Sequence, residues 1–158
     1  PEDALSRFPQ MKKAMKIKVI NRSAYALPQY ETAGAAGMDV RADIRESIVL
    51  GPLERTLVPT GLYVEIPDGY EIQVRPRSGL AARHGISLVN SPGTIDPDYR
   101  GEITVILLNT STEERRLRRG ERIAQLVFQP AFQVEMETSD TLSATERGAG
   151  GFGHTGNA

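Results

Sequence analysis

Residues 57–76 read LVPTGLYVEIPDGYEIQVRP, and the alternation within this stretch indicates the fold class. Apolar side chains occupy every second position of residues 62–66 and again of residues 70–74. A period of two places each apolar set on one face of a strand. The Pro-Asp-Gly sequence of residues 67–69 supplies a turn, because proline presets φ and glycine accepts a positive φ. The stretch therefore predicts two strands joined as a β-hairpin.

Short runs of the same kind recur along the chain, with glycine or proline between most of them. Further strands are predicted at residues 16–20, 38–44, 47–50, 86–89, 103–108 and 122–128. No long segment shows the 3.6-residue period of an amphipathic helix. Many short strands without long helices are typical of a sandwich, a jelly roll or a barrel. We therefore expect an all-β fold, a jelly roll or distorted β-barrel, with one short helix.

Length and composition restrict the function. The chain has 158 residues and a net charge of −1, which suit one domain without a bulk electrostatic attraction to nucleic acid or anionic lipid. No nucleic-acid or membrane partner is therefore expected. The chain contains no cysteine, which excludes disulfides, thiolate metal sites and a cysteine nucleophile. No window approaches 18 apolar residues and no signal peptide is evident, so a soluble cytoplasmic protein is expected.

Three regions are expected from the patterning. Residues 1–15 lack periodicity at their start and are predicted to be a flexible N-terminal extension. Residues 16–135 form the predicted β-domain, and residues 136–158 form a C-terminal arm. The arm contains RGAGGFGHTG (147–156), in which five of ten residues are glycine. Glycine loses the most backbone freedom on ordering and offers no side chain to a core, so this tail is predicted to be flexible.

Residues 76–85, PRSGLAARHG, predict the short helix. Ser78 can cap its first turn, Gly85 can end it, and Arg83 and His84 are placed favourably in the last turn. Backbone N–H groups at a helix start, next to Arg77, also suit an anion. The cap and the anion site are compatible interpretations.

Three other stretches break local rules. The loop 90–102, NSPGTIDPDYRGE, places many charges between two apolar strands, and it is either a solvated loop with weak Asp–Arg pairs or a site. Gln125 shares a strand face with apolar neighbours, so its amide should be at least half-buried and needs a partner, ordinarily nearby backbone. Asp39 enters a strand from the small-residue loop 33–40, where a turn aspartate is the ordinary interpretation. The charged run 113–122, EERRLRRGER, predicts a solvated hairpin, and no partner is assigned to it.

Taken together, five segments closely resemble the five motifs of the homotrimeric dUTP pyrophosphatases (dUTPases) in order and spacing. They read AGMDV, PRSGLA, GTIDPDYRGE, GERIAQLVF and RGAGGFGHTG, and the resemblance covers about residues 16–156. The resemblance implies a jelly-roll trimer whose three active sites lie at subunit interfaces. It also implies hydrolysis of dUTP to dUMP and diphosphate, with Mg²⁺ held by the triphosphate. That reaction keeps uracil out of DNA and supplies dUMP for dTMP synthesis.

The resemblance further implies individual roles. Asp96 matches the aspartate that activates water for attack on the α-phosphate, and Tyr99 the tyrosine that leaves no room for a 2′-hydroxyl. Asn90 and the backbone around residues 93–95 match the hairpin that reads uracil, and Asp39 a carboxylate near the magnesium-bound water. The other residues match phosphate or base contacts. The full implied substrate-binding set is Arg77, Ser78, Gly79, Asn90, Gly93, Thr94, Ile95, Tyr99, Thr104, Gln125, Arg147, Phe152, Gly153, His154 and Thr155.

The chemistry agrees with these roles, because phosphoryl transfer needs one base, a metal-bound triphosphate and many donors. No P-loop is present, so phosphate binding must come from scattered donors, which favours an interface. The alternatives are a dCTP deaminase of the same fold, which needs a glutamate base that is absent beside PRSG, and a non-catalytic jelly-roll binding module. A serine hydrolase built on Ser78 lacks the G-x-S-x-G context. A histidine metal site is not expected, since the chain contains only two histidines.

Overall fold

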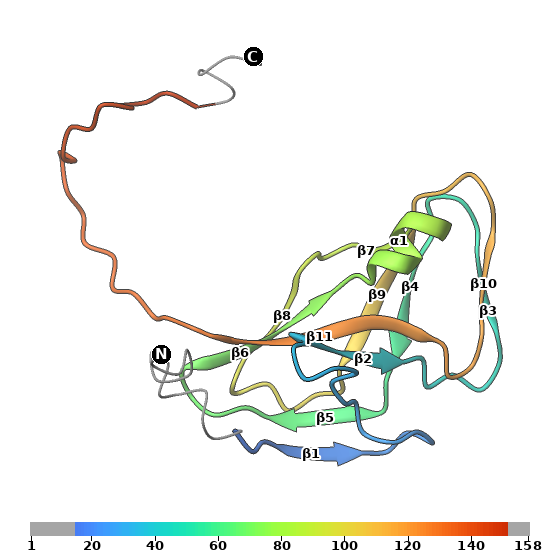
Figure 1. Cartoon of the computed structure of the whole chain (residues 1–158). Helices are drawn as coiled ribbons and strands as arrows, with labels where there is room; N and C mark the ends of the chain where they lie inside the picture. Colours follow the sequence, from blue (N-terminus) through green and yellow to red (C-terminus); the bar gives the residue numbers. More distant parts are fainter. Residues whose placement is uncertain (1–14, 152–158) are drawn as a thin grey trace, which may run out of the picture.

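Eleven short strands and one helix make up residues 15–151, the part of the chain that this computed structural model describes (Figure 1). The helix α1 spans Ser78–His84. The strands are β1 (Lys18–Asn21), β2 (Gly37–Arg41), β3 (Ile48–Leu50), β4 (Arg55–Pro59), β5 (Leu62–Glu65), β6 (Tyr70–Arg75), β7 (Ile86–Leu88), β8 (Gly93–Ile95), β9 (Thr104–Asn109), β10 (Arg115–Leu117) and β11 (Arg122–Pro130).

The strands pair only in antiparallel fashion within the described residues, and they form four sheets. A four-stranded sheet has the order β2-β11-β6-β8, and a three-stranded sheet has the order β4-β9-β7. Two further pairs, β1-β5 and β10-β3, complete the body. The predicted all-β jelly roll with one short helix is confirmed, while the described strands do not close into a barrel.

The predicted hairpin between β5 and β6 is wrong. β5 pairs with β1, whereas β6 pairs with β8 and β11. The turn at 67–69 does form, with Gly69 at φ 83°, and the Gly69 carbonyl accepts a hydrogen bond from the N–H of Ala131. It carries the chain from one sheet to another. The apolar faces of both strands are buried as expected; a period of two identifies the buried face of a strand but not its neighbour.

The charged run 113–122 is likewise not an isolated solvated hairpin. Its residues Arg115–Leu117 form β10, which pairs with β3. Leu117 is 4% exposed, and Arg115 forms an ion pair with Glu121. The single leucine among the charges therefore attaches the segment to the body, because burial of its side chain removes apolar surface from water. The charged neighbours can stay in contact with water. The strands β4 and β8 were also not predicted from the sequence.

The core lies between the sheets and consists of aliphatic side chains, of which the largest fully buried ones are Leu50, Ile72, Ile103, Leu107 and Ile123. Asn109 is a polar exception with 0% exposure. Its amide nitrogen donates to three backbone carbonyls, and its oxygen accepts two hydrogen bonds from Ser111. Every polar atom of this buried amide is therefore satisfied.

At the surface, the Lys18 ammonium donates a hydrogen bond to Glu65 across β1 and β5, at 3.0 Å. This hydrogen bond and the positive charge lower the pKa of the Glu65 carboxyl. Among residues 15–151, no helix has the length and apolar character needed to cross a membrane.

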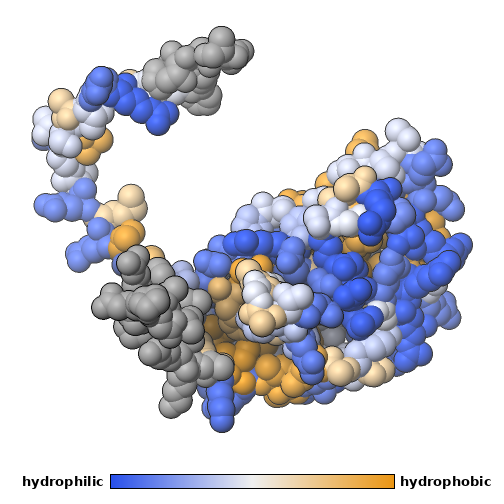
Figure 2. Space-filling view, in the orientation of Figure 1, coloured by the Kyte–Doolittle hydropathy of each residue, from blue (hydrophilic) through white to orange (hydrophobic). Residues whose placement is uncertain are grey.

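Two apolar surfaces are left uncovered by residues 15–151. An elongated groove of about 640 Å³ lies along β1 and β5 and the ends of β6 and β11, lined by apolar side chains that Figure 2 shows gathered on this face. Beyond Pro130 the chain leaves the body as an extended arm (Figure 1). On the arm Phe132, Val134 and Met136 are exposed at alternate positions.

Candidate active site

A cavity of about 110 Å³ lies between β8 and β9 and is lined by residues of both larger sheets. Most of its accessible lining is polar, and the buried valines Val74 and Val105 are among the lining residues. Six of the predicted substrate-binding residues line it: Asn90, Gly93, Thr94, Ile95, Tyr99 and Thr104. A small cavity with many polar groups and a few apolar side chains suits a small polar ring.

Asn90 lies against the backbone of β8. A Cβ atom added at Gly93 would lie 2.9 Å from the Asn90 amide nitrogen, closer than real Cβ contacts. The glycine is therefore what allows the Asn90 side chain to approach the strand. An amide presents both a donor and an acceptor, which is what recognition of a polar base edge requires.

The loop after β8 carries Asp96 and Tyr99. Asp96 is exposed, and its carboxylate forms no ion pair with any residue in the range 15–151. The Tyr99 N–H donates to the Asp96 carbonyl at 3.2 Å. Arg100 donates to the backbone carbonyls of Pro97 and Tyr99, at 2.6 and 3.0 Å, rather than to an aspartate. The interpretation of the loop as weak Asp–Arg pairs is thus wrong, and the Asp96 carboxylate remains available.

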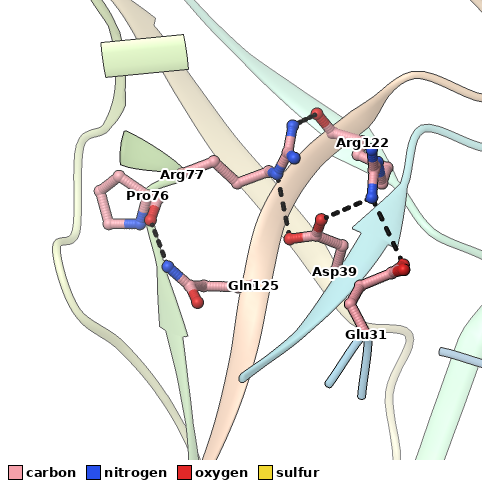
Figure 3. Close-up of polar contacts among 6 residues, drawn as sticks. All are labelled: Glu31, Asp39, Pro76, Arg77, Arg122 and Gln125. Carbon is pink, nitrogen blue, oxygen red and sulfur yellow. Dashed lines mark hydrogen bonds and ion pairs between the residues drawn. The ribbon is translucent and has the colours of Figure 1, made fainter. Parts of the chain in front are cut away.

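A second group of polar side chains lies around Asp39 on β2 (Figure 3). One Asp39 oxygen accepts from Arg77 at 3.0 Å, and the other lies 3.2 Å from a guanidinium nitrogen of Arg122. Arg77 also donates to the Arg122 carbonyl at 3.3 Å, and Arg122 contacts Glu31 at 3.4 Å. The side chains of Asp39 and Arg77 are 19% and 27% exposed. A carboxylate held between two arginines fixes the direction of both guanidinium groups.

Gln125 is half-buried on β11, as expected, and its amide nitrogen donates to the Pro76 carbonyl at 3.0 Å (Figure 3). The ordinary interpretation, a backbone partner, is confirmed. A Cβ added at Gly37 would lie 2.5 Å from the Gln125 amide oxygen. The amide is therefore confined between β2 and the end of β6.

The prediction that Ser78 caps α1 is wrong. The N-cap residue is Arg77, in an extended conformation, and no side chain caps the helix. Ser78 is already the first helical residue, so its hydroxyl is not at the capping position. The other end agrees with the sequence: Gly85 adopts the left-handed conformation with φ 63°, and Arg83 and His84 lie in the last turn. Ser78 and Gly79 thus begin the helix beside the Arg77–Asp39 pair.

The second group is spread across the sheet that borders the cavity: Asp39 lies on the edge strand β2, Gln125 on the inner strand β11, and Arg77 just after β6, the neighbour of β8. Asp39 pairs in register with Gln125 and Gln125 with Arg75, whereas Gly93 pairs with Val74 on the far strand. Three strand spacings separate β2 from β8, or about 14 Å. The lining of the 110 Å³ cavity includes neither Arg77 nor Gln125. One chain therefore does not place all the predicted residues around one cavity.

Comparisons with known proteins agree with these motifs. A sequence model of the dUTPase family matches residues 23–156. The chain belongs to the dUTPase family. A deoxyuridine 5′-triphosphate nucleotidohydrolase of Fusobacterium nucleatum is 58% identical over 144 residues, covering 91% of this chain and 99% of that protein. The protein of the same name from Brucella melitensis is 56% identical over 144 residues, covering 90% and 92%.

Solved structures agree as well. A dUTPase of Staphylococcus bacteriophage 80alpha with dUPNHPP matches with a TM-score of 0.82 at 26% identity, and the match covers 91% of this chain and 100% of that chain. The predicted family, and with it the prediction that the chain is an enzyme, is confirmed.

The fifth dUTPase motif lies on the arm. Arg147 is exposed and donates to the Gly150 carbonyl at 2.8 Å, within its own segment. Phe152, Gly153, His154 and Thr155 lie outside the described residues, so their predicted contacts stay predictions.

Within residues 15–151, no group of three acidic or histidine side chains is placed to hold a metal ion. Each Asp39 oxygen already faces an arginine. A carboxylate has about four lone-pair positions, so Asp39 can still accept a hydrogen bond from a water molecule. The donor set therefore fits a magnesium ion that arrives with a triphosphate and keeps its water, and it does not form a cage of its own.

Arg122 and Glu31 were not predicted as site residues in this dUTPase. Arg122 ends the charged run that was interpreted as solvated, although it also stands within the GERIAQLVF motif. The available signal was Asp39, because a half-buried carboxylate requires a partner. The sequence does not say which of the many arginines supplies it.

Proposed function

We propose that this chain hydrolyses dUTP to dUMP and diphosphate. One observation carries the proposal: in a member of the dUTPase family, the Asp96 carboxylate, which forms no ion pair within residues 15–151, directly follows a strand that lines a cavity together with Asn90 and Tyr99. The relatives from Fusobacterium and Brucella bear the name of this activity. In metabolism the reaction would keep uracil out of DNA and supply dUMP for dTMP synthesis. A cytoplasmic location stays a prediction.

In this proposal Asp96 acts as the general base. The carboxylate accepts a proton from a water molecule while the water oxygen forms a bond to the α-phosphorus, and the bond from that phosphorus to the bridging oxygen breaks. Diphosphate leaves with the electron pair, and dUMP retains the new oxygen. Phosphoryl transfer of this kind depends on positioning and charge neutralisation more than on covalent catalysis.

The nucleoside would occupy the 110 Å³ cavity. Asn90 and the backbone of Gly93–Ile95 supply the donors and acceptors for uracil, and the backbone of β8 limits the space beside its 5-position. Tyr99 forms the wall beside the sugar. These contacts favour a pyrimidine 2′-deoxynucleotide over its ribonucleotide.

The triphosphate would bind to the second group. Arg77 and Gln125 are donors, and Ser78 and Gly79 at the start of α1 add their own. Magnesium bound by the triphosphate would supply neutralisation of the phosphate charge, and Asp39 would accept a hydrogen bond from its water. Arg147 and the tail residues 152–155 would close over the bound nucleotide.

A homotrimer would combine the two groups. Each chain offers a nucleoside cavity and a phosphate-binding group whose residues Arg77 and Gln125 do not line it. A neighbouring copy can supply the missing group to each cavity. The apolar groove and the exposed apolar side chains of the arm also support association, since contiguous exposed apolar surfaces are typical of interfaces.

The test is diphosphate release from dUTP, UTP, dTTP and dCTP, with and without magnesium, combined with the native mass of the particle. We expect diphosphate from dUTP in the presence of magnesium and a mass of three chains. Ammonia released from dCTP would indicate the deaminase alternative instead. No turnover of any of the four nucleotides would overturn the proposal.

A further inference from the structure

Tyr99 occupies the space that a side chain at Gly101 would need. An ideal Cβ at Gly101 would lie 2.5 Å from the ring carbon that bears the Tyr99 hydroxyl and 2.9 Å from the adjacent ring carbon. Gly101 does not have a positive φ, so the turn itself does not require glycine. The close approach of the ring requires it.

The same end of the ring, which carries the hydroxyl, is also tethered by a hydrogen bond. The Tyr99 O–H donates to the Glu102 carbonyl at 2.9 Å, while 44% of the residue remains exposed. The position of this partly exposed ring therefore depends on the contact with Gly101 and on the tether to Glu102.

Glu102 is itself fixed to the turn between β4 and β5. Its carboxylate accepts a hydrogen bond from the Gly61 N–H at 2.7 Å. The next residue along, Ile103, donates through its N–H to the Leu62 carbonyl at 2.8 Å and accepts from the Thr60 hydroxyl at 2.6 Å. The carbonyl that tethers Tyr99 thus belongs to a segment held at both of its ends.

We propose that Gly101 and Glu102 are positioning residues that set the sugar specificity of the site. They hold the Tyr99 ring at one place along the wall of the cavity, so that the position of the ring, and not its size alone, excludes a 2′-hydroxyl. The inference rests on the proposed function, because it takes the Tyr99 wall to be the sugar contact.

The test compares binding of dUMP and UMP by calorimetry, so that it does not depend on turnover. The variants are Gly101→Ala, with Gly34→Ala as the matched control, because a Cβ at Gly34 meets no atom within 4 Å. Rejection of an added hydroxyl by a packed wall is on the order of 10²-fold, and displacement of the wall should lower the preference for dUMP about tenfold. Gly34→Ala should leave the preference unchanged.

A second pair of variants, at Glu102, tests the inference if Gly101→Ala fails to fold. Glu102→Ala removes the acceptor for the Gly61 N–H and should lower the preference for dUMP, whereas Glu102→Gln retains an acceptor oxygen and should restore most of it. A purely structural role would change the melting temperature without changing this ratio.

The outcomes separate the two proposals. An unchanged dUMP preference in folded Gly101→Ala and Glu102→Ala, or a wild-type chain that does not prefer dUMP to UMP, overturns the inference. A wild-type chain that prefers dUMP yet releases no diphosphate from dUTP overturns the proposed function alone.

Discussion

Replacement of Asp96 by asparagine should separate catalysis from binding in this dUTPase. The side chain is exposed and forms no ion pair with residues 15–151, so the free energy of unfolding should change by less than about 0.5 kcal/mol. Asparagine has the same shape but cannot accept a proton at neutral pH. Loss of a general base lowers kcat about 10²–10⁴-fold, which corresponds to about 3–5 kcal/mol of transition-state stabilisation.

The assay measures three quantities on one preparation: kcat for diphosphate release, the Kd for a non-hydrolysable dUTP analogue, and the melting temperature. Only kcat should fall. Asp98→Asn is the matched control, because Asp98 is an exposed aspartate two residues further along the same loop. This substitution changes the charge of the loop by the same amount. Wild-type kcat in Asp96→Asn would remove Asp96 from the mechanism, and an equal loss in Asp98→Asn would show that the effect comes from the charge of the loop.

Three further predictions concern the body and the arm. Asn109→Ala leaves one buried and two partly buried carbonyls and a backbone N–H without their partner, so urea unfolding should show a loss of about 3 kcal/mol; a loss below 1 kcal/mol would mean that water replaces the amide. Arg122→Gln removes one of the two arginines that contact Asp39 and should raise KM for dUTP about tenfold. The loss of stability should be small, because the ion pair is partly exposed. An unchanged KM would mean that the ion pair has a structural role only. Deletion of residues 147–158 should preserve the melting temperature, since within residues 15–151 Arg147 forms hydrogen bonds only inside the arm. It should reduce turnover of dUTP to a small fraction; wild-type turnover would refute a closing role for the tail.

The sequence predicted those parts of the fold that depend on local pattern. Alternation identified which faces of β5 and β6 are buried, and Gly69 and Gly85 marked the turn and the helix end. It did not predict strand partners, because pairing is decided by contacts between distant segments. For the same reason the hairpin was wrong, and β10 was hidden in a charged run whose only apolar residue is Leu117.

The candidate site, like the fold, could be predicted from the sequence only in part. Its residues within motifs were predicted by resemblance, and the structure brings Asn90, Tyr99 and four others around one cavity. The partners that orient them could not be predicted. The choice of Arg122 for Asp39 depends on the register of β11 against β2, in which Arg122 lies opposite Arg41 and a bulge follows. No local sequence signal sets that register.

The glycines of the motifs connect the backbone fold with the side chains of the candidate site. At three motif glycines that lack a positive φ, a Cβ would lie within 3 Å of a side chain predicted to contact substrate. The pairs are Gly37 with Gln125, Gly93 with Asn90, and Gly101 with Tyr99. Their identity is therefore set by the approach of a functional side chain to the backbone and not by the turn. A rigid backbone on one side of each side chain limits its rotamers before substrate arrives, so part of the entropy cost of ordering the site is met during folding.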